Sequence, residues 1–251
     1  MSDGSDGTEP RWLRRFGRPV ESDVKLVCFP HAGGAASAYA GLARALAPAV
    51  ELWAVQYPGR QDRRHEPPPA SLTGVAEVVA DLLRPWTGRY ALFGHSMGAV
   101  VAYETAVRLE RSGSGPERVF LSGRGAPSLG PGPSDGLQGD DALLAEIERL
   151  GGSSEALREP ELLALVLPTL NGDYAALRAY RWDPAARLRC PVTALVGERD
   201  PLVSAADAAA WLDLSDARGE SRVLDGGHFY LDAQVDVVAG IVTDALGVPA
   251  R

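Results

Sequence analysis

A serine between two glycines stands where a predicted strand turns into a predicted helix. The apolar run 90–93 precedes Gly94-His95-Ser96-Met97-Gly98, and residues 99–109 follow with helical spacing. A sharp strand-to-helix turn exposes the serine oxygen, and the helix N-terminus directs backbone N–H groups toward negative charge near it. The pattern therefore predicts a strand–turn–helix unit that presents Ser96 as a nucleophile.

Apolar runs and helical patterns alternate along most of the chain. Short apolar runs predict strands at 25–29, 50–57, 89–93, 118–122, 192–196 and 222–224. Helical spacing predicts helices at 37–46, 72–86, 99–111, 205–214 and 231–246. Alternation of this kind is typical of the α/β class, with a mostly parallel central sheet and helices on both faces. A chain of 251 residues suits one such domain.

A base and an acid for Ser96 are predicted at the ends of two later strands. Asp200 follows the strand at 192–196, and His228 follows the strand at 222–224. Parallel strands place such tips along one edge of a sheet, where Ser96 also lies. We expect His228 to take the serine proton and Asp200 to orient His228.

Other residues of the same types remain alternatives. Glu198 and Asp225 compete with Asp200 for the role of acid, although the turn that begins at Pro201 favours Asp200. The remaining histidines, which compete with His228 for the role of base, are His31, His65 and His95.

A glycine-rich loop after the strand at 25–29 is the candidate for one half of an oxyanion hole. It reads Pro30-His31-Ala32-Gly33-Gly34-Ala35. Such a loop at a strand end can turn a backbone N–H inward. We expect the N–H groups of Ala32 and Met97 to hold the oxyanion together.

These segments together resemble the stand-alone type II thioesterases that accompany polyketide and nonribosomal peptide synthases. The segments that carry the resemblance are Phe29-Pro30-His31-Ala32-Gly33-Gly34, Tyr57-Pro58-Gly59-Arg60 with Arg63, Gly94-His95-Ser96-Met97-Gly98, Gly197-Glu198-Arg199-Asp200 and Gly227-His228-Phe229. They run from about residue 26 to residue 229 in one order, which is more specific than any single motif.

The resemblance implies an α/β-hydrolase fold and an editing function. Members of this family hydrolyse acyl thioesters on the phosphopantetheine arm of acyl or peptidyl carrier domains, and they need no cofactor. Two alternatives stay open at this point. A small-molecule carboxylesterase or lipase of the same fold would use the same triad, and a non-catalytic binding protein could share the fold.

The predicted domain has two further parts. Residues 1–20 are expected to form a poorly ordered arm before the hydrolase domain at 21–251. No strand is predicted between about 123 and 189, where we expect a lid insertion with helices at 140–150, 159–167 and 174–180. Apolar residues of this lid either pack it onto the core or line an acyl pocket, namely Leu162, Leu163, Val166, Leu170, Tyr174, Leu177 and Tyr180.

Composition argues against several classes of binding partner. The net charge of -8 argues against nucleic-acid binding, which usually shows a basic stripe. No apolar run of about eighteen residues and no secretory signal is present, so we expect no membrane contact and a cytoplasmic location. Cys28 and Cys190 are expected as core residues, no metal-ligand spacing occurs, and we expect a monomer.

Two arginine clusters stand out against the negative net charge. They are either solvated surface or docking points for an acidic carrier domain. The first comprises Arg11, Arg14, Arg15 and Arg18, and the second comprises Arg60, Arg63 and Arg64.

Overall fold

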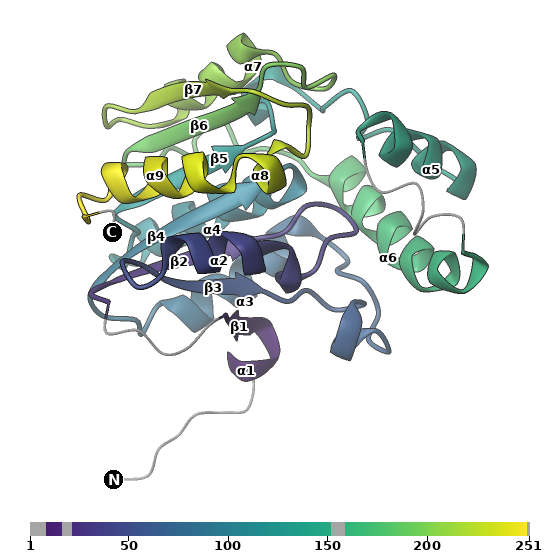
Figure 1. Ribbon diagram of the computed structural model, residues 1–251, viewed down its shortest axis with the longest axis horizontal. Coiled ribbons are helices and arrows are strands. Elements are labelled where there is room, and N and C mark those ends of the chain that lie inside the picture. Colours follow the sequence, from purple (N-terminus) through teal and green to yellow (C-terminus); the bar gives the residue numbers. More distant parts are fainter. Residues whose placement is uncertain (1–8, 17–21, 152–158, 250–251) are drawn as a thin grey trace, which may run out of the picture.

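The fold is built on one seven-stranded sheet with the strand order β1-β3-β2-β4-β5-β6-β7 (Figure 1). A computed structural model describes residues 9–16, 22–151 and 159–249. The strands are β1 Leu13–Arg15, β2 Val24–Phe29, β3 Glu51–Val55, β4 Arg89–His95, β5 Arg118–Ser122, β6 Val192–Gly197 and β7 Glu220–Leu224. Every neighbouring pair is parallel except β1 with β3. This confirms the predicted α/β class with a mostly parallel sheet.

Helices cover both faces of the sheet. The helices are α1 Glu9–Trp12, α2 Ala40–Leu46, α3 Leu72–Leu83, α4 Met97–Arg111, α5 Asp140–Arg149, α6 Pro160–Ala179, α7 Ala205–Ala209, α8 Tyr230–Ala233 and α9 Val235–Ala245. Helices α3 and α4 pack on one face with Trp211, and α2 and α9 pack on the other (Figure 1). The central strands are therefore apolar on both sides, which explains their continuous hydrophobic runs.

The segment from Glu9 to Arg15 is structured, which differs from the poorly ordered arm expected for residues 1–20. It forms α1 and the edge strand β1, and Leu13 is only 2% exposed in the core. The backbone N–H of Gln56 donates to the Trp12 carbonyl at 2.8 Å, which extends the pairing of β1 with β3. The buried leucine and the antiparallel pairing tie this short run to the edge of the sheet. Residues 1–8 and 17–20 lie outside the described residues.

Helices α5 and α6 fall between β5 and β6 in the sequence and lie to one side of the sheet (Figure 1). Helix α6 runs through Pro168, where the sequence predicted an end or a kink between two helices. Pro168 lacks the N–H that would bond to the Ala164 carbonyl, but both residues are exposed and water can satisfy that carbonyl. Packing of the following turn, where Leu170 is 1% exposed, favours the continuous helix.

Candidate active site

Ser96 lies on a strained turn between β4 and α4. Its φ of 55° and ψ of -118° are uncommon for a residue with a side chain. Both flanking glycines are required by close contacts, because a Cβ atom on Gly98 would lie 2.0 Å from the Phe29 carbonyl oxygen and one on Gly94 would lie 2.1 Å from the Gly98 oxygen. The Ser96 N–H donates to the Ser122 carbonyl at 2.8 Å, which anchors the turn to β5. The predicted strand–turn–helix unit is therefore present.

Ser96, His228 and Asp200 form one hydrogen-bonded chain. His228 Nδ1 donates to Asp200 Oδ2 at 2.8 Å, and His228 Nε2 accepts from Ser96 Oγ at 3.1 Å. The side chains of His228 and Asp200 are 2% and 0% exposed. Because the carboxylate must accept at Nδ1, Nε2 of the neutral ring is free to accept the serine proton. This arrangement can activate a hydroxyl nucleophile.

Close approach of two loops brings Asp200 and His228 together. The loop after β6 donates its Arg199 N–H to the Gly226 carbonyl of the loop after β7 at 2.9 Å. A Cβ atom on Gly197 would lie 2.3 Å from the Gly227 oxygen, so only glycine fits there. Asp200 Oδ1 also accepts the Leu202 N–H at 2.9 Å, which fixes the carboxylate in its turn.

The competing acids lie elsewhere. Asp225 pairs with Arg199 at 2.6 Å, and the side chains of Glu198 and Asp225 are 68% and 67% exposed. Neither has a hydrogen bond to a histidine ring among the described residues. The geometry therefore joins only Asp200 of the three candidates to His228.

The other histidines differ from His228 in their contacts. His65 is exposed on the loop after β3. His95 is 1% exposed, with its Nδ1 2.8 Å from Ser122 Oγ, and Ser122 Oγ lies 2.6 Å from the Tyr230 hydroxyl. Burial is the largest cause that lowers the pKa of His95, and burial likewise lowers the pKa of His31 to about 4. Both rings therefore stay neutral beside the triad at neutral pH.

The two backbone N–H groups that the sequence offered for an oxyanion hole have no hydrogen-bond partner among the described residues. Among the described residues, the N–H groups of Ala32 and Met97 make no hydrogen bond, whereas Gly33 donates to Asp173 Oδ2 at 2.8 Å and Gly34 donates to the His31 carbonyl at 2.9 Å. Met97 begins α4, where a free N–H is expected at the helix N-terminus. These are the two donors that the sequence singled out for an oxyanion.

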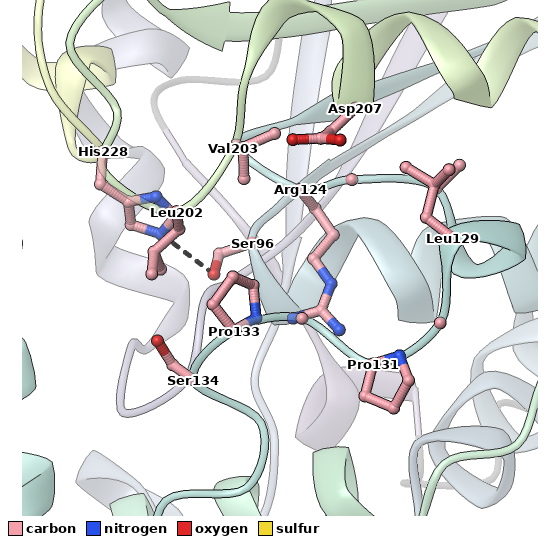
Figure 2. Close-up of a pocket in the computed structure, with 15 residues that line it drawn as sticks. Ser96, Arg124, Leu129, Pro131, Pro133, Ser134, Leu202, Val203, Asp207 and His228 are labelled. Carbon is pink, nitrogen blue, oxygen red and sulfur yellow. Dashed lines mark hydrogen bonds between the residues drawn. The ribbon is translucent and has the colours of Figure 1, made fainter.

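A cavity of about 210 Å³ opens beside Ser96 (Figure 2). One wall is the segment from Gly123 to Ser134, and the other holds Leu202, Val203, Asp207 and His228. Figure 2 shows Pro133, Ser134 and Leu202 around the hydrogen bond between Ser96 and His228. Nothing local in the sequence showed that the segment from Gly123 to Ser134 faces the serine.

The apolar residues of helices α5 and α6 do not line this cavity. None of the seven that the sequence offered for an acyl pocket lines it. Leu170 and Tyr174 pack against Leu143 in a small core of the insertion, and Leu162 is 43% exposed. Leu177 and Tyr180 line a second cavity of about 510 Å³. The packing alternative therefore holds for Leu170 and Tyr174.

The two cavities are neighbours. Both are bordered by Arg124, Gly130 and Pro131. The second cavity is lined further by Trp182, Arg178 and Arg181. Among the described residues, neither Arg178 nor Arg181 forms an ion pair, so this cavity is bordered by two cations that have no carboxylate partner.

Five of the seven arginines in the two clusters are paired with carboxylates. Arg60 and Arg63 are 4% and 6% exposed. The ion pairs are Arg11 with Glu66, Arg14 with Asp62, Arg15 with Glu51, Arg60 with Asp173 and Arg63 with Glu66. The guanidinium groups of Arg60 and Arg63 pack against the rings of Tyr57 and Trp12, which takes these two charges off the surface. Arg64 remains exposed, and Arg18 lies outside the described residues.

The structure shows no feature of a metal centre in the part of the chain that it describes. No group of three or more His, Cys, Asp or Glu side chains could hold an ion there. Cys28 and Cys190 are free and buried, as predicted. None of the described helices combines the length and the apolarity that crossing a membrane requires.

The fold and the site define an α/β-hydrolase with a serine–histidine–aspartate constellation. Comparison with known proteins narrows this class. A family model for the thioesterase domain matches residues 24–246. Thioesterase PikA5 of Streptomyces venezuelae is 47% identical over 239 residues, which cover 94% of this chain and 85% of PikA5.

Solved structures agree with this comparison. The type II thioesterase BorB from the borrelidin biosynthetic cluster superimposes with a TM-score of 0.85 at 41% identity, covering 94% of this chain and 97% of BorB. YbtT, a type II thioesterase from the yersiniabactin pathway, superimposes with a TM-score of 0.84 at 30% identity. The match covers 94% of this chain and 98% of YbtT. The chain belongs to the thioesterase family and is a type II editing thioesterase of polyketide or nonribosomal peptide biosynthesis.

Proposed function

We propose that this thioesterase hydrolyses acyl thioesters carried on the phosphopantetheine arm of acyl or peptidyl carrier domains, with Ser96, His228 and Asp200 as its catalytic residues. The observation that carries the assignment is the position of His228, whose ring is hydrogen bonded to Asp200 on one side and to Ser96 on the other. The family of the chain and the names of its relatives support the substrate class.

Acylation begins at the Ser96 hydroxyl. Oγ attacks the thioester carbonyl carbon while His228 Nε2 takes the hydroxyl proton, and the carbonyl oxygen becomes an oxyanion. The N–H groups of Ala32 and Met97 hold this oxyanion. When the carbonyl re-forms, the carbon–sulfur bond breaks and the imidazolium returns its proton to the departing sulfur. The arm leaves as a thiol, and Ser96 carries the acyl group as an ester.

Deacylation repeats the same steps with water. His228 takes a proton as a water oxygen attacks the ester carbonyl, and the same two N–H groups hold the second oxyanion. Collapse breaks the bond between the acyl carbon and Oγ, and His228 returns the proton to the serine. Throughout, Asp200 keeps Nδ1 protonated and stabilises the imidazolium.

Both cavities have a place in this proposal. The cavity beside Ser96 receives the acyl group, because it is the space that borders the nucleophile. The second cavity lies beyond Arg124 and is bordered by Arg178 and Arg181. Their unpaired charges suit the phosphate of the arm and the acidic surface typical of carrier domains.

A comparison of three substrates tests the proposal. The same acyl group is supplied on a carrier domain, on a small thiol and as an oxygen ester, and kcat/KM is measured for each. We expect the carrier-bound thioester to give the highest value. Equal efficiency on all three at low salt would instead favour the small-molecule carboxylesterase. The monomeric state and the cytoplasmic location stay predictions from the sequence.

A further inference from the structure

A buried carboxylate outside the triad joins the helical insertion to the loop that follows β2. We propose that Asp173 of α6 is a positioning residue, which holds Gly33 and Arg60 so that the Ala32 N–H stays free for the oxyanion. The inference rests on the proposed function, because it concerns the same catalytic cycle. Asp173 is 1% exposed and makes no contact with the triad among its hydrogen bonds.

Asp173 binds the peptide between Ala32 and Gly33 directly. Gly33 donates its N–H to Asp173 Oδ2 at 2.8 Å and has a φ of +75°. This conformation favours glycine, and a Cβ atom there would also meet Leu170 of α6 at 3.1 Å. The peptide that follows Ala32 is therefore oriented by α6 through both a hydrogen bond and close packing.

Asp173 also acts on Gly34 through Arg60. Arg60 binds the same Asp173 oxygen through Nη2 and donates from Nε to the Gly34 carbonyl at 2.6 Å. Its guanidinium carbon lies 4.8 Å from the centre of the Tyr57 ring, and the Tyr57 hydroxyl donates to the Pro30 carbonyl at 3.3 Å. Asp173 and Arg60 thus hold two peptides of the loop, the one between Ala32 and Gly33 and the one that follows Gly34.

The hydrogen bonds of the loop leave the Ala32 N–H without a partner among the described residues. Asp173 takes the Gly33 N–H, and the His31 carbonyl takes the Gly34 N–H. Ala32 directly precedes Gly33, and its own N–H makes no hydrogen bond among the described residues. Without Asp173, the Gly33 N–H would lose its acceptor and the loop would gain freedom to turn. Removal of one oxyanion donor costs about 10²- to 10³-fold in kcat, so a displaced donor should lower kcat toward that range.

Attachment of the insertion does not depend on this pair alone. Thr169, one turn earlier in α6, donates to the Gly59 carbonyl at 2.6 Å and is also buried. Leu170 and Tyr174 pack with Leu143 and with Ala32. A buried ion pair is often replaceable by apolar side chains without loss of stability, so a purely structural role would leave catalysis intact when both charges are removed together.

The test compares variants of the full chain on a small-thiol acyl thioester. Asp173→Leu combined with Arg60→Met removes both charges and keeps most of the buried volume. Asp173→Asn keeps an oxygen that can accept from Gly33 and Arg60. Thr169→Val is the matched control, because it removes another buried bond from α6 to the core. For each variant we measure kcat, KM, the thermal midpoint and the Kd of an alkyl boronic acid, whose adduct with serine places an oxygen in the oxyanion hole.

We expect the double variant to lose about 10²-fold in kcat with KM nearly unchanged, and the boronic acid Kd to rise by a similar factor. Asp173→Asn should keep kcat and the boronic acid Kd much closer to the wild-type values than the double variant does. Thr169→Val should lower the thermal midpoint yet leave kcat and the Kd near wild type. A folded double variant with wild-type kcat and Kd would overturn the positioning role, and so would equal kcat losses in Thr169→Val. Hydrolysis retained by Ser96→Ala would instead overturn the proposed function and this role with it.

Discussion

Arg124 and Asp135 form a two-point ion pair where the two cavities meet. Arg124 Nη1 donates to Asp135 Oδ1 at 2.7 Å, and Nη2 binds Oδ2. Arg124 borders both cavities, and Asp135 also accepts the Gly132 N–H at 2.7 Å, which ties the pair to the wall of the first cavity. A guanidinium group held in place therefore borders both cavities.

Removal of this pair should lengthen the preferred acyl chain. Arg124→Ala with Asp135→Asn joins the two cavities and leaves no unpaired buried charge. Each further buried methylene contributes about 0.8 kcal/mol, so kcat/KM for longer small-thiol thioesters should rise several-fold relative to acetyl. Arg149→Ala is the control, because Arg149 pairs with Glu146 of the insertion but lines neither cavity. An unchanged chain-length profile would show that the pair does not bound the acyl site.

The acid of the triad should be identified by neutral amide variants. Asp200→Asn should lower kcat on the order of 10⁴-fold, because the amide favours the wrong tautomer of His228. Glu198 and Asp225 are exposed, so kcat of Glu198→Gln and of Asp225→Asn should stay near the wild-type value. Steady-state hydrolysis of one thioester by the three variants checks this. A large loss in Asp225→Asn with none in Asp200→Asn would reverse the assignment.

Carrier recognition should depend on Arg181 rather than on the cluster near Arg64. Arg181 is exposed beside the second cavity, so Arg181→Glu should lower kcat/KM for a carrier-bound substrate by about 3- to 10-fold at low salt. The loss should shrink as salt screens the charge. Small-thiol hydrolysis should not change, and Arg64→Glu serves as the exposed control. If Arg64→Glu had the larger effect, docking would lie on the loop after β3.

Stability should fall on mild acidification because of His31 and His95, whose pKa values are lowered. The pKa values of His31 and His95 are lowered, that of His31 to about 4, so between about pH 6.5 and pH 4 the unfolded chain binds protons that the folded chain does not. Unfolding thus becomes easier as pH falls through this window, and stability is restored above about pH 6.5.

Chemical denaturation at pH 7 and pH 5 measures the effect. From pH 7 to pH 5, His31 should account for about 1–2 kcal/mol of lost stability. His31→Gln and His95→Gln should each flatten the pH dependence, whereas the exposed His65→Gln should not. Equal slopes in all three variants would mean that other groups control the acid sensitivity.

The triad could be predicted from the sequence because its members follow strands. Ser96, Asp200 and His228 each stand just beyond an apolar run, and the parallel sheet brings such positions to one edge. The close contacts at Gly98 and Gly197 show why glycine stands beside these residues. Local patterns of this kind can be recognised in the sequence without any knowledge of packing.

The contacts that shape the site depend on distant parts of the chain. Asp173 lies 140 residues from Gly33, and no spacing in the sequence connects them. Arg60 and Arg63 carry charges that usually indicate surface, yet aromatic rings and carboxylates bury them. Pro168 predicted a break that the packing of Leu170 overrides. Burial of a charge or a proline is decided by tertiary partners that the sequence does not place.

The rate of acid release from an acyl-carrier substrate by Ser96→Ala, beside wild type, tests the central claim most directly. A hydroxyl on a strained turn can be lost without disturbing the core, so the variant should keep its fold, which circular dichroism can verify. We expect the rate to fall by roughly four to six orders of magnitude, because only substrate binding and the oxyanion donors remain. A folded variant that retained more than about a tenth of the wild-type rate would contradict catalysis by Ser96.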